Sequence, residues 1–113
     1  MKDFRNKLVF IPGGSSGIGL SAARLLVEKG ADVLLLARGE ERLRAAVEDL
    51  EGRRSSTGQR CGWMRLDVSD PREVDRVLRE ALDAYGTPDL LINCAGRAIP
   101  RPFEEIDHAQ FDE

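Results

Sequence analysis

Short apolar runs alternate along this chain with longer stretches in which apolar residues return every three or four positions. The segments 8–11, 31–37, 63–68 and 90–93 are predicted to be strands, and the first two carry the continuous apolar runs of parallel strands buried on both faces. The stretches 16–29, 40–50 and 71–85 have the periodicity of amphipathic helices. The positions expected to face the core are Ile18, Ala22, Leu25 and Leu26, then Leu43, Ala46, Val47 and Leu50, then Val74, Val77, Leu78, Ala81 and Leu82.

Turn-forming and capping residues separate these segments. Residues 12–14 (Pro-Gly-Gly) end the first strand, and Gly30 ends the first helix. Asp70 precedes a proline at the start of the third helix, and Glu73 lies where it would complete a capping box. The boundaries of the predicted helices therefore rest on residue chemistry as well as on periodicity.

The alternation predicts an α/β fold, a Rossmann-type, doubly wound parallel sheet with helices on both faces. We expect residues 1–113 to form one domain portion, because no linker or repeat divides them. Residues 52–62 carry no periodicity and predict a mobile surface loop, 97–103 a second loop, and 104–113 the opening of a fourth helix. Because the last strand needs cover at its free edge, we expect the N-terminal portion of a larger domain.

Composition narrows the functional classes. The 113 residues include 17 Lys plus Arg and 20 Asp plus Glu, for a net charge of −3, and 42% are hydrophobic. The apolar fraction argues against a disordered segment, and the acidity argues against electrostatically driven nucleic-acid binding. No apolar run approaches the roughly 20 residues that cross a bilayer, so a cytoplasmic location is expected. Cys61 and Cys94 lack metal-ligand spacing and are interpreted as two reduced, partly buried thiols.

A glycine-rich turn at 13–19 (Gly-Gly-Ser-Ser-Gly-Ile-Gly) joins the first strand to the first helix, which is the place of a dinucleotide-binding turn in a βαβ unit. Gly13 would allow a tight exit from the strand, Gly17 the approach of a diphosphate to the backbone, and Gly19 close packing of the helix on the sheet. Amides at the helix start and the hydroxyls of Ser15 and Ser16 would hold the phosphate charge. The alternative is a flexible Gly-Ser turn that binds nothing.

The residues after the second strand indicate which nicotinamide cofactor the turn would take. An acidic residue at this point holds the adenosine ribose and selects NAD. Here Ala37 leaves room for a 2′-phosphate, Arg38 can bind it, and Arg42 would lie about one helical turn on. The sequence therefore favours NADP(H). The alternative is that both arginines are solvated and paired with Glu40 and Glu41.

Three motifs, in sequence order, resemble the short-chain dehydrogenase/reductase family: the Gly-x-x-x-Gly-x-Gly turn, Asp67-Val68 after the third strand, and Asn93-Cys94-Ala95-Gly96 after the fourth. The resemblance implies that Asp67 accepts a hydrogen bond from the adenine amino group, with Val68 beside the ring. It also implies that Asn93 braces the sheet behind the cofactor, and that Ala95 and Gly96 line the ribose on the nicotinamide side. From the residues alone, Asp67 as a helix-start turn residue and Asn93 as a purely structural hydrogen-bonding residue remain open.

Two positions depart from the family pattern. Pro12 stands where members usually carry Thr, which removes a hydroxyl and a backbone donor at the end of a central strand. Cys94 stands in a motif that is more commonly Asn-Asn-Ala-Gly. In this variant, in the Gly-Gly-Ser-Ser-Gly turn and in Leu-Ala-Arg followed by a basic residue four positions later, the chain is similar to members that reduce 3-ketosphinganine.

The family resemblance implies hydride transfer between the nicotinamide and a carbonyl or alcohol substrate, with a Tyr as general acid/base, a Lys four residues later, and a Ser. Tyr85 is the chain's one tyrosine and Asp89 lies four residues after it, so no catalytic residue is predicted here and these residues alone are expected to be inactive. Tyr85 is interpreted as a packing residue, and His108, the single histidine, as a solvated residue.

Two functional hypotheses follow. In the first, the chain is the cofactor-binding half of an NADPH-dependent reductase of ketones, with a lipid-like 3-keto compound as a candidate substrate and a homo-oligomer as the expected parent. In the second, it is a non-catalytic NADP(H)-binding module. Neither hypothesis includes a metal, a nucleic acid or a membrane span.

Overall fold

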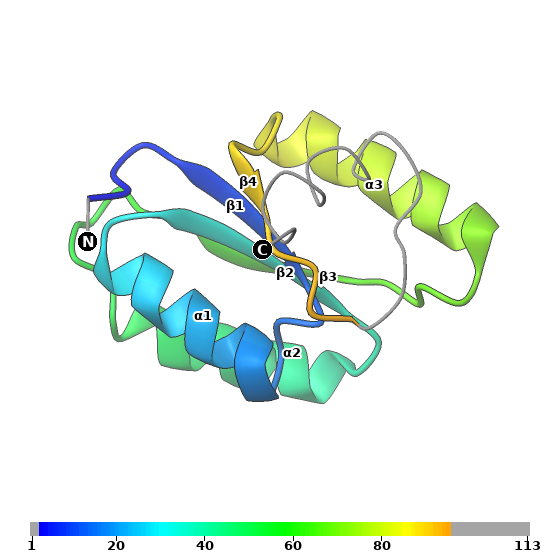
Figure 1. The fold of residues 1–113 in the computed structure, drawn as a ribbon, viewed down its shortest axis with the longest axis horizontal. Helices are drawn as coiled ribbons and strands as arrows, with labels where there is room; N and C mark the ends of the chain where they lie inside the picture. The colour runs from blue at the N-terminus through cyan, green and yellow to red at the C-terminus, as the bar shows by residue number, and fades with distance from the viewer. Residues whose placement is uncertain (1–2, 96–113) are drawn as a thin grey trace, which may run out of the picture.

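The computed structural model describes residues 3–95, which form one four-stranded sheet and three helices (Figure 1). The strands are β1 (Leu8–Pro12), β2 (Asp32–Ala37), β3 (Cys61–Arg65) and β4 (Leu90–Leu91), and the helices are α1 (Gly17–Glu28), α2 (Glu40–Glu51) and α3 (Pro71–Tyr85). The predicted loop at 97–103, the predicted helix at 104–113 and Gly96 lie outside the described residues.

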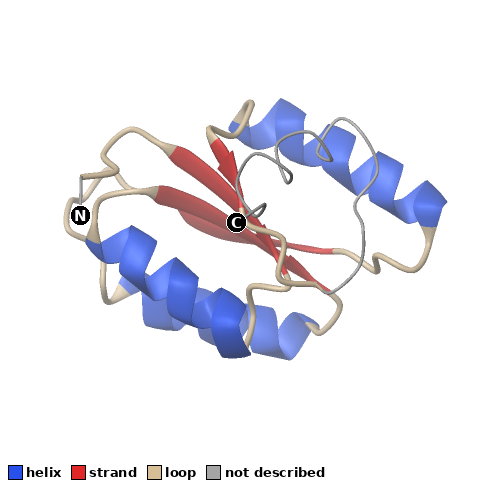
Figure 2. Ribbon diagram, in the orientation of Figure 1, coloured by secondary structure: helices blue, strands red, loops and turns tan. Residues whose placement is uncertain are grey.

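The sheet is parallel throughout, in the order β3-β2-β1-β4. Helices α1 and α2 cover one face and α3 covers the other (Figure 2). The chain steps outward from β1 to β2 and β3, and then returns to pair β4 with the other side of β1, so the strand order reverses at β1. This confirms the predicted Rossmann-type α/β arrangement.

Strand β1 is buried along its whole length, because its side chains alternate between two cores. Val9 and Ile11 join the core beneath α1 and α2, while Leu8 and Phe10 join the core beneath α3. The four middle residues of β2 divide in the same way. The continuous apolar runs in the sequence thus reflect a sheet covered on both faces.

The predicted core face of α1 is wrong at two positions. Ile18 is 82% exposed and Leu25 is 45% exposed. The helix instead turns Gly19, Ala23, Leu26 and Val27 toward the sheet. The glycine at the first of these positions lets the start of the helix lie close to the turn that precedes it. Apolar residues adjoin each buried position, so periodicity alone could not select the face.

Strand β4 ends at Leu91, although the pattern predicts a strand over 90–93. The carbonyls of Phe10 and Pro12 still accept hydrogen bonds from the amides of Ile92 at 3.0 Å and Cys94 at 2.8 Å. The N–H and C=O of a strand residue point to the same neighbour, so an amide at residue 12 would donate to the carbonyl of Ile92, and proline has no such donor. Pro12 therefore interrupts the ladder while leaving the chain beside β1.

A buried amide anchors the segment 52–62, most of which is a surface loop, as predicted, with residues 52–58 exposed. Gln59 is 6% exposed. Its Nε2 donates to the carbonyls of Val27 and Ala31, at 2.8 Å each, and its Oε1 accepts from the amides of Ser55 at 2.7 Å and Ser56 at 2.9 Å. The side-chain donors and the acceptor of Gln59 all have partners, so these hydrogen bonds offset the cost of burying the amide.

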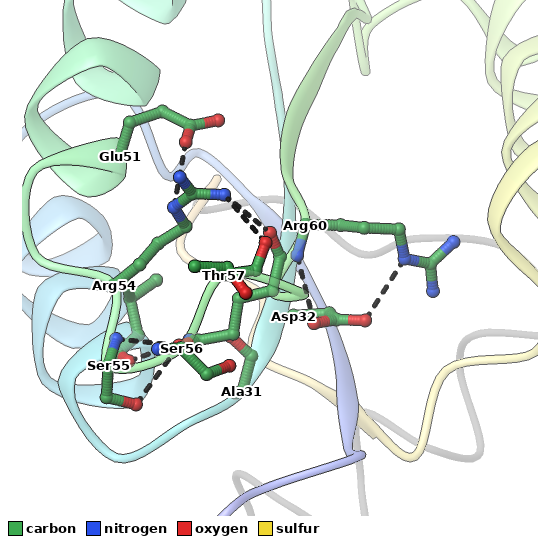
Figure 3. A network of polar contacts seen from close by, with 10 residues as sticks. Ala31, Asp32, Glu51, Arg54, Ser55, Ser56, Thr57 and Arg60 are labelled. Carbon is green, nitrogen blue, oxygen red and sulfur yellow. Dashed lines mark hydrogen bonds and ion pairs between the residues drawn. The ribbon is translucent and has the colours of Figure 1, made fainter.

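Two arginines complete this anchored loop (Figure 3). Arg54 pairs with Glu51 at 3.0 Å and donates to the Gln59 carbonyl at 3.2 Å, and Arg60 pairs with Asp32 at 3.0 Å. The backbone then pairs with β2 from residue 61, two residues before the predicted strand start, and β3 ends at residue 65 rather than 68. Hydrogen bonding to β2 determines where β3 begins and ends, and the residues of β3 do not show an apolar pattern that would predict these positions.

We expect Gln59→Ala to lower the free energy of unfolding by about 2–3 kcal/mol, because it strips two carbonyls and two amides of their partner. Urea denaturation measures this change. The exposed residue Glu48 on α2 provides the control, and Glu48→Ala should change the stability by less than about 0.5 kcal/mol. Equal stability of the two variants would show that Gln59 does not anchor the loop.

Candidate functional site

A cleft of about 310 Å³ opens at the carboxyl-terminal edge of the sheet. It lies beside the point at which the strand order reverses, where ligands bind in open α/β sheets. Its walls come from the glycine-rich turn, the end of β2, the turn after β3 and the residues after β4. The lining residues are Gly13, Ser15, Ser16, Leu36, Ala37, Arg38, Leu66, Asp67, Val68, Ser69, Cys94 and Ala95.

The fold thus brings together residues that lie up to 82 positions apart in the sequence, from Gly13 to Ala95. Of the predicted site residues, the lining includes Gly13, Ser15, Ser16, Arg38, Asp67, Val68 and Ala95. It does not include Gly17, Ile18, Gly19, Arg42 or Asn93. The cleft is also lined by Leu36, Leu66, Ser69 and Cys94, for which the sequence predicts no site role. Their main signal in the sequence is that each lies within two residues of a predicted site residue.

Gly13 joins the turn to the end of β4. Its φ is +79°, and a Cβ at this position would lie 2.6 Å from the carbonyl carbon of Cys94 and 2.7 Å from the amide nitrogen of Ala95. Its amide donates to the carbonyl of Leu36 at 2.7 Å. One residue therefore holds three strand ends together, and both its backbone angle and its surroundings require glycine.

The first turn of α1 leaves its backbone donors open. Ser16 precedes the helix in an extended conformation, its side chain forms no capping hydrogen bond, and the first turn carries no acidic residue. A Cβ at Gly17 would meet nothing within 4 Å, so the missing side chain leaves open space above the helix start. The positive end of the helix dipole and unfilled amides are suited to an anion.

Gly19 has a close contact, as predicted, but with a different partner. A Cβ there would collide with the carbonyl oxygen of Gly13 and lie 2.9 Å from the Cα of Gly14. Gly19 therefore lets the turn fold back on the first turn of α1, rather than letting the helix approach the strands. Ile18, between these glycines, points largely into solvent.

A second cavity, of about 540 Å³, adjoins the cleft at the end of β2. Ser15, Ala37 and Arg38 line both cavities, and Gly39, Glu41 and Arg42 complete the second. Nine of the twelve arginines between residues 3 and 95 form ion pairs with described residues; Arg38, Arg42 and Arg72 form none. The predicted alternative of pairing with Glu40 and Glu41 does not occur among these residues, and Glu40 instead binds Arg44 at 2.7 Å.

Asp67 lies in a tight turn between β3 and α3. Its Oδ1 accepts hydrogen bonds from the hydroxyl of Ser69 at 2.6 Å and from the amide of Ser69 at 3.0 Å, while no described residue binds its Oδ2. These hydrogen bonds hold the pKa of the Asp67 carboxyl below its usual range, and the charges of Arg38 and Arg65 lower it further. Asp67 is thus a turn residue, and its Oδ2 has no hydrogen-bond partner among residues 3–95.

The residues after β4 close the cleft on the side away from Asp67. The Oδ1 of Asn93 accepts a hydrogen bond from the amide of Ala95 at 3.1 Å, so Asn93 braces the backbone that lines the cleft. Cys94 and Cys61 are both half-buried free thiols, as predicted. Burial raises the pKa of the Cys94 thiol and raises that of Cys61 to about 11, so neither is a ready thiolate.

Tyr85 lies away from the cleft, at the carboxyl end of α3. It packs against the core beneath α3, and the Arg60 guanidinium lies 5.3 Å from its ring centroid. This confirms Tyr85 as a packing residue. Among residues 3–95 no three His, Cys, Asp or Glu side chains form a group that could hold a metal ion, and no described helix is long and apolar enough to cross a membrane.

A parallel sheet whose order reverses beside a glycine turn, with an uncapped helix behind that turn, defines the Rossmann-type class of α/β proteins. Comparison with protein families narrows this class. The family described as short chain dehydrogenase matches residues 7–113. The chain belongs to this family of oxidoreductases.

One relative and two solved structures illustrate the similarity. The 3-ketodihydrosphingosine reductase of Mus musculus is 36% identical over 106 residues, which are 93% of this chain and 32% of the relative. A short chain oxidoreductase of Pseudomonas aeruginosa PAO1, solved with NADPH bound, matches with a TM-score of 0.76 and 37% identity over 87% of this chain and 37% of that one. An NAD⁺-bound xylitol dehydrogenase matches with a TM-score of 0.72 and 26% identity over 80% and 33%. The chain spans about a third of the length of these proteins.

We expect Gly13→Ala to destabilise the fold by more than about 2 kcal/mol, because the side chain would occupy a strained backbone conformation and overlap the peptide after β4. Gly58→Ala is the control, since its Cβ would meet nothing within 4 Å, and it should change the stability by less than about 1 kcal/mol. Urea unfolding compares the two. A tolerated substitution at Gly13 would mean that the contact with residues 94–95 is not close in solution.

Proposed function

We propose that these residues form the NADP(H)-binding part of an oxidoreductase that moves hydride between the nicotinamide and a ketone or secondary alcohol. The observation that carries the choice of cofactor is the position of Arg38 and Arg42. These two guanidiniums form no ion pair with any residue of 3–95, and they line a cavity where β2 ends in Ala37. With Glu41 in the same lining, the formal charge there is +1, which favours a phosphate over a bare ribose hydroxyl.

The residues present fit the parts of such a cofactor. The space above Gly17 and the open amides of α1 suit the diphosphate, with Ser16 beside them. Asp67 and Val68 would hold the adenine, Arg38 and Arg42 the 2′-phosphate, and Ala95 would lie along the nicotinamide ribose. The nicotinamide, when bound, supplies or accepts the hydride.

The substrate proposal rests on the relatives. The mouse relative is named as a reductase of 3-ketodihydrosphingosine, and we propose a lipid-like ketone as the first substrate to test. The sequence contains no Tyr-x-x-x-Lys, so proton transfer would require residues other than these 113. No observation specifically favours the non-catalytic module, because the relatives are oxidoreductases.

We expect Arg38→Ala to weaken NADPH binding roughly 10- to 100-fold and to leave NADH binding within about twofold, because only NADPH carries the phosphate that Arg38 would bind. Arg42→Ala should act in the same direction with a smaller effect, since Arg42 lines the second cavity but not the cleft. Titration of each nucleotide, followed by its fluorescence, measures both affinities.

Arg72 provides the matched control, because it is also without an ion pair among the described residues but lines neither cavity. Arg72→Ala should leave both affinities unchanged. If Arg38→Ala weakens NADH as much as NADPH, Arg38 does not select the phosphate. If the unaltered protein binds NADH as well as NADPH, the proposed preference is wrong.

A further inference from the structure

We infer that Glu73 is a positioning residue for the adenine end of the cleft. Its carboxylate holds the backbone amide of Asp67 and thereby fixes the turn that presents Asp67 and Val68 to the ligand. The inference rests on the proposed function, because it assigns Asp67 and Val68 to the adenine. Glu73 itself does not line the cleft, so its effect must pass through the turn.

The contact departs from the capping box that the sequence predicts. Asp70 does cap α3, since its Oδ1 accepts from the amides of Arg72 at 3.0 Å and Glu73 at 3.5 Å. In a capping box the Glu73 side chain would return to the amide of Asp70. Instead its Oε1 accepts from the amide of Asp67 at 3.1 Å, three residues earlier. The side chain therefore serves the turn rather than the helix end.

This hydrogen bond lies at the point where the chain leaves the sheet. The amide of Leu66 still donates to the carbonyl of Ala37 in β2, at 2.7 Å, and the amide of Asp70 donates to the carbonyl of Asp67 at 3.1 Å. The amide of Asp67, which lies between these two backbone hydrogen bonds in the sequence, donates to the side chain of Glu73 on α3. Removal of that acceptor would leave a part-buried donor without its partner and free the turn to rotate, which would carry the carboxylate of Asp67 with it.

The two oxygens of Glu73 have separate partners, which makes the inference testable. Oε1 binds the Asp67 amide, whereas Oε2 faces Arg65 at 3.7 Å and Arg76 at 3.6 Å. The side chain is only 17% exposed, while those of the two arginines are 56% and 59% exposed. A glutamine keeps an acceptor oxygen but loses the ion pairs, and an aspartate keeps the charge but is one methylene too short to reach the same amide.

The test measures binding of adenosine 2′,5′-bisphosphate, which carries the adenine and the 2′-phosphate without the nicotinamide, by isothermal titration calorimetry. We expect Glu73→Ala and Glu73→Asp to weaken binding about 3- to 10-fold and Glu73→Gln to stay within about twofold of the unaltered protein. In an Asp67→Ala background, Glu73→Ala should weaken binding clearly less than it does in the unaltered protein, because one of the two side chains that the turn presents is already gone.

Glu80→Ala on the same helix is the control, since Glu80 also pairs with Arg76, at 3.2 Å, but lies away from the turn. It should leave binding unchanged, and thermal unfolding verifies that every variant is folded at the titration temperature. Loss of binding in Glu73→Gln equal to that in Glu73→Ala, or an undiminished loss in the Asp67→Ala background, would overturn the positioning role. If the unaltered protein fails to bind the bisphosphate, the proposed function itself is contradicted; if it binds and Glu73→Ala binds equally well, only this inference is contradicted.

Discussion

The carboxyl-terminal edge of the sheet depends on one close backbone contact, between Gly13 and the peptide that follows Cys94. The Gly13 amide also reaches the carbonyl of Leu36, so the ends of β1, β2 and β4 are tied at a single residue. From this junction the chain passes through Ser15 and Ser16, which line the cleft, into α1. Gly13 has no room for a side chain. The position of the site therefore depends on contacts between backbone segments, to which the side chains that face the cleft are attached.

The charges of the molecule are distributed in two ways. Over most of the surface, arginines are paired with carboxylates, as in the Arg24–Asp49–Arg53 group between α1 and α2. Beside the cleft, Arg38 and Arg42 form no ion pairs with described residues, and the first turn of α1 carries no acidic residue. Exposed ion pairs contribute little to stability, so the protein loses little by leaving these two cations unpaired, and the local field is left for an anion.

Much of the fold follows from the sequence, because its strongest signals are local. The apolar runs of β1 and β2, the turn at 13–19 and the cap at Asp70 predict where these strands end and where α1 and α3 begin. The segments at these ends include those that line the cleft. The structure differs from the prediction where a residue distant in the sequence determines the local conformation. Pro12 in β1 shortens the neighbouring strand β4, because it lacks the backbone donor that would continue the pairing. Gln59 anchors a loop through hydrogen bonds to two carbonyls near the end of α1. Glu73 binds the amide of Asp67 instead of the amide of the capping residue. In α1, apolar residues on neighbouring faces left the buried face undetermined, and only the packing of Gly19 against Gly13 resolves it.

The most direct test of the account is a crystal structure of the protein with NADP⁺. We expect the diphosphate on the amides at the start of α1, above Gly17, and the 2′-phosphate within hydrogen-bond distance of the Arg38 guanidinium. Nucleotide bound elsewhere, or bound in this cleft with its 2′-phosphate turned away from Arg38 into solvent, would contradict it.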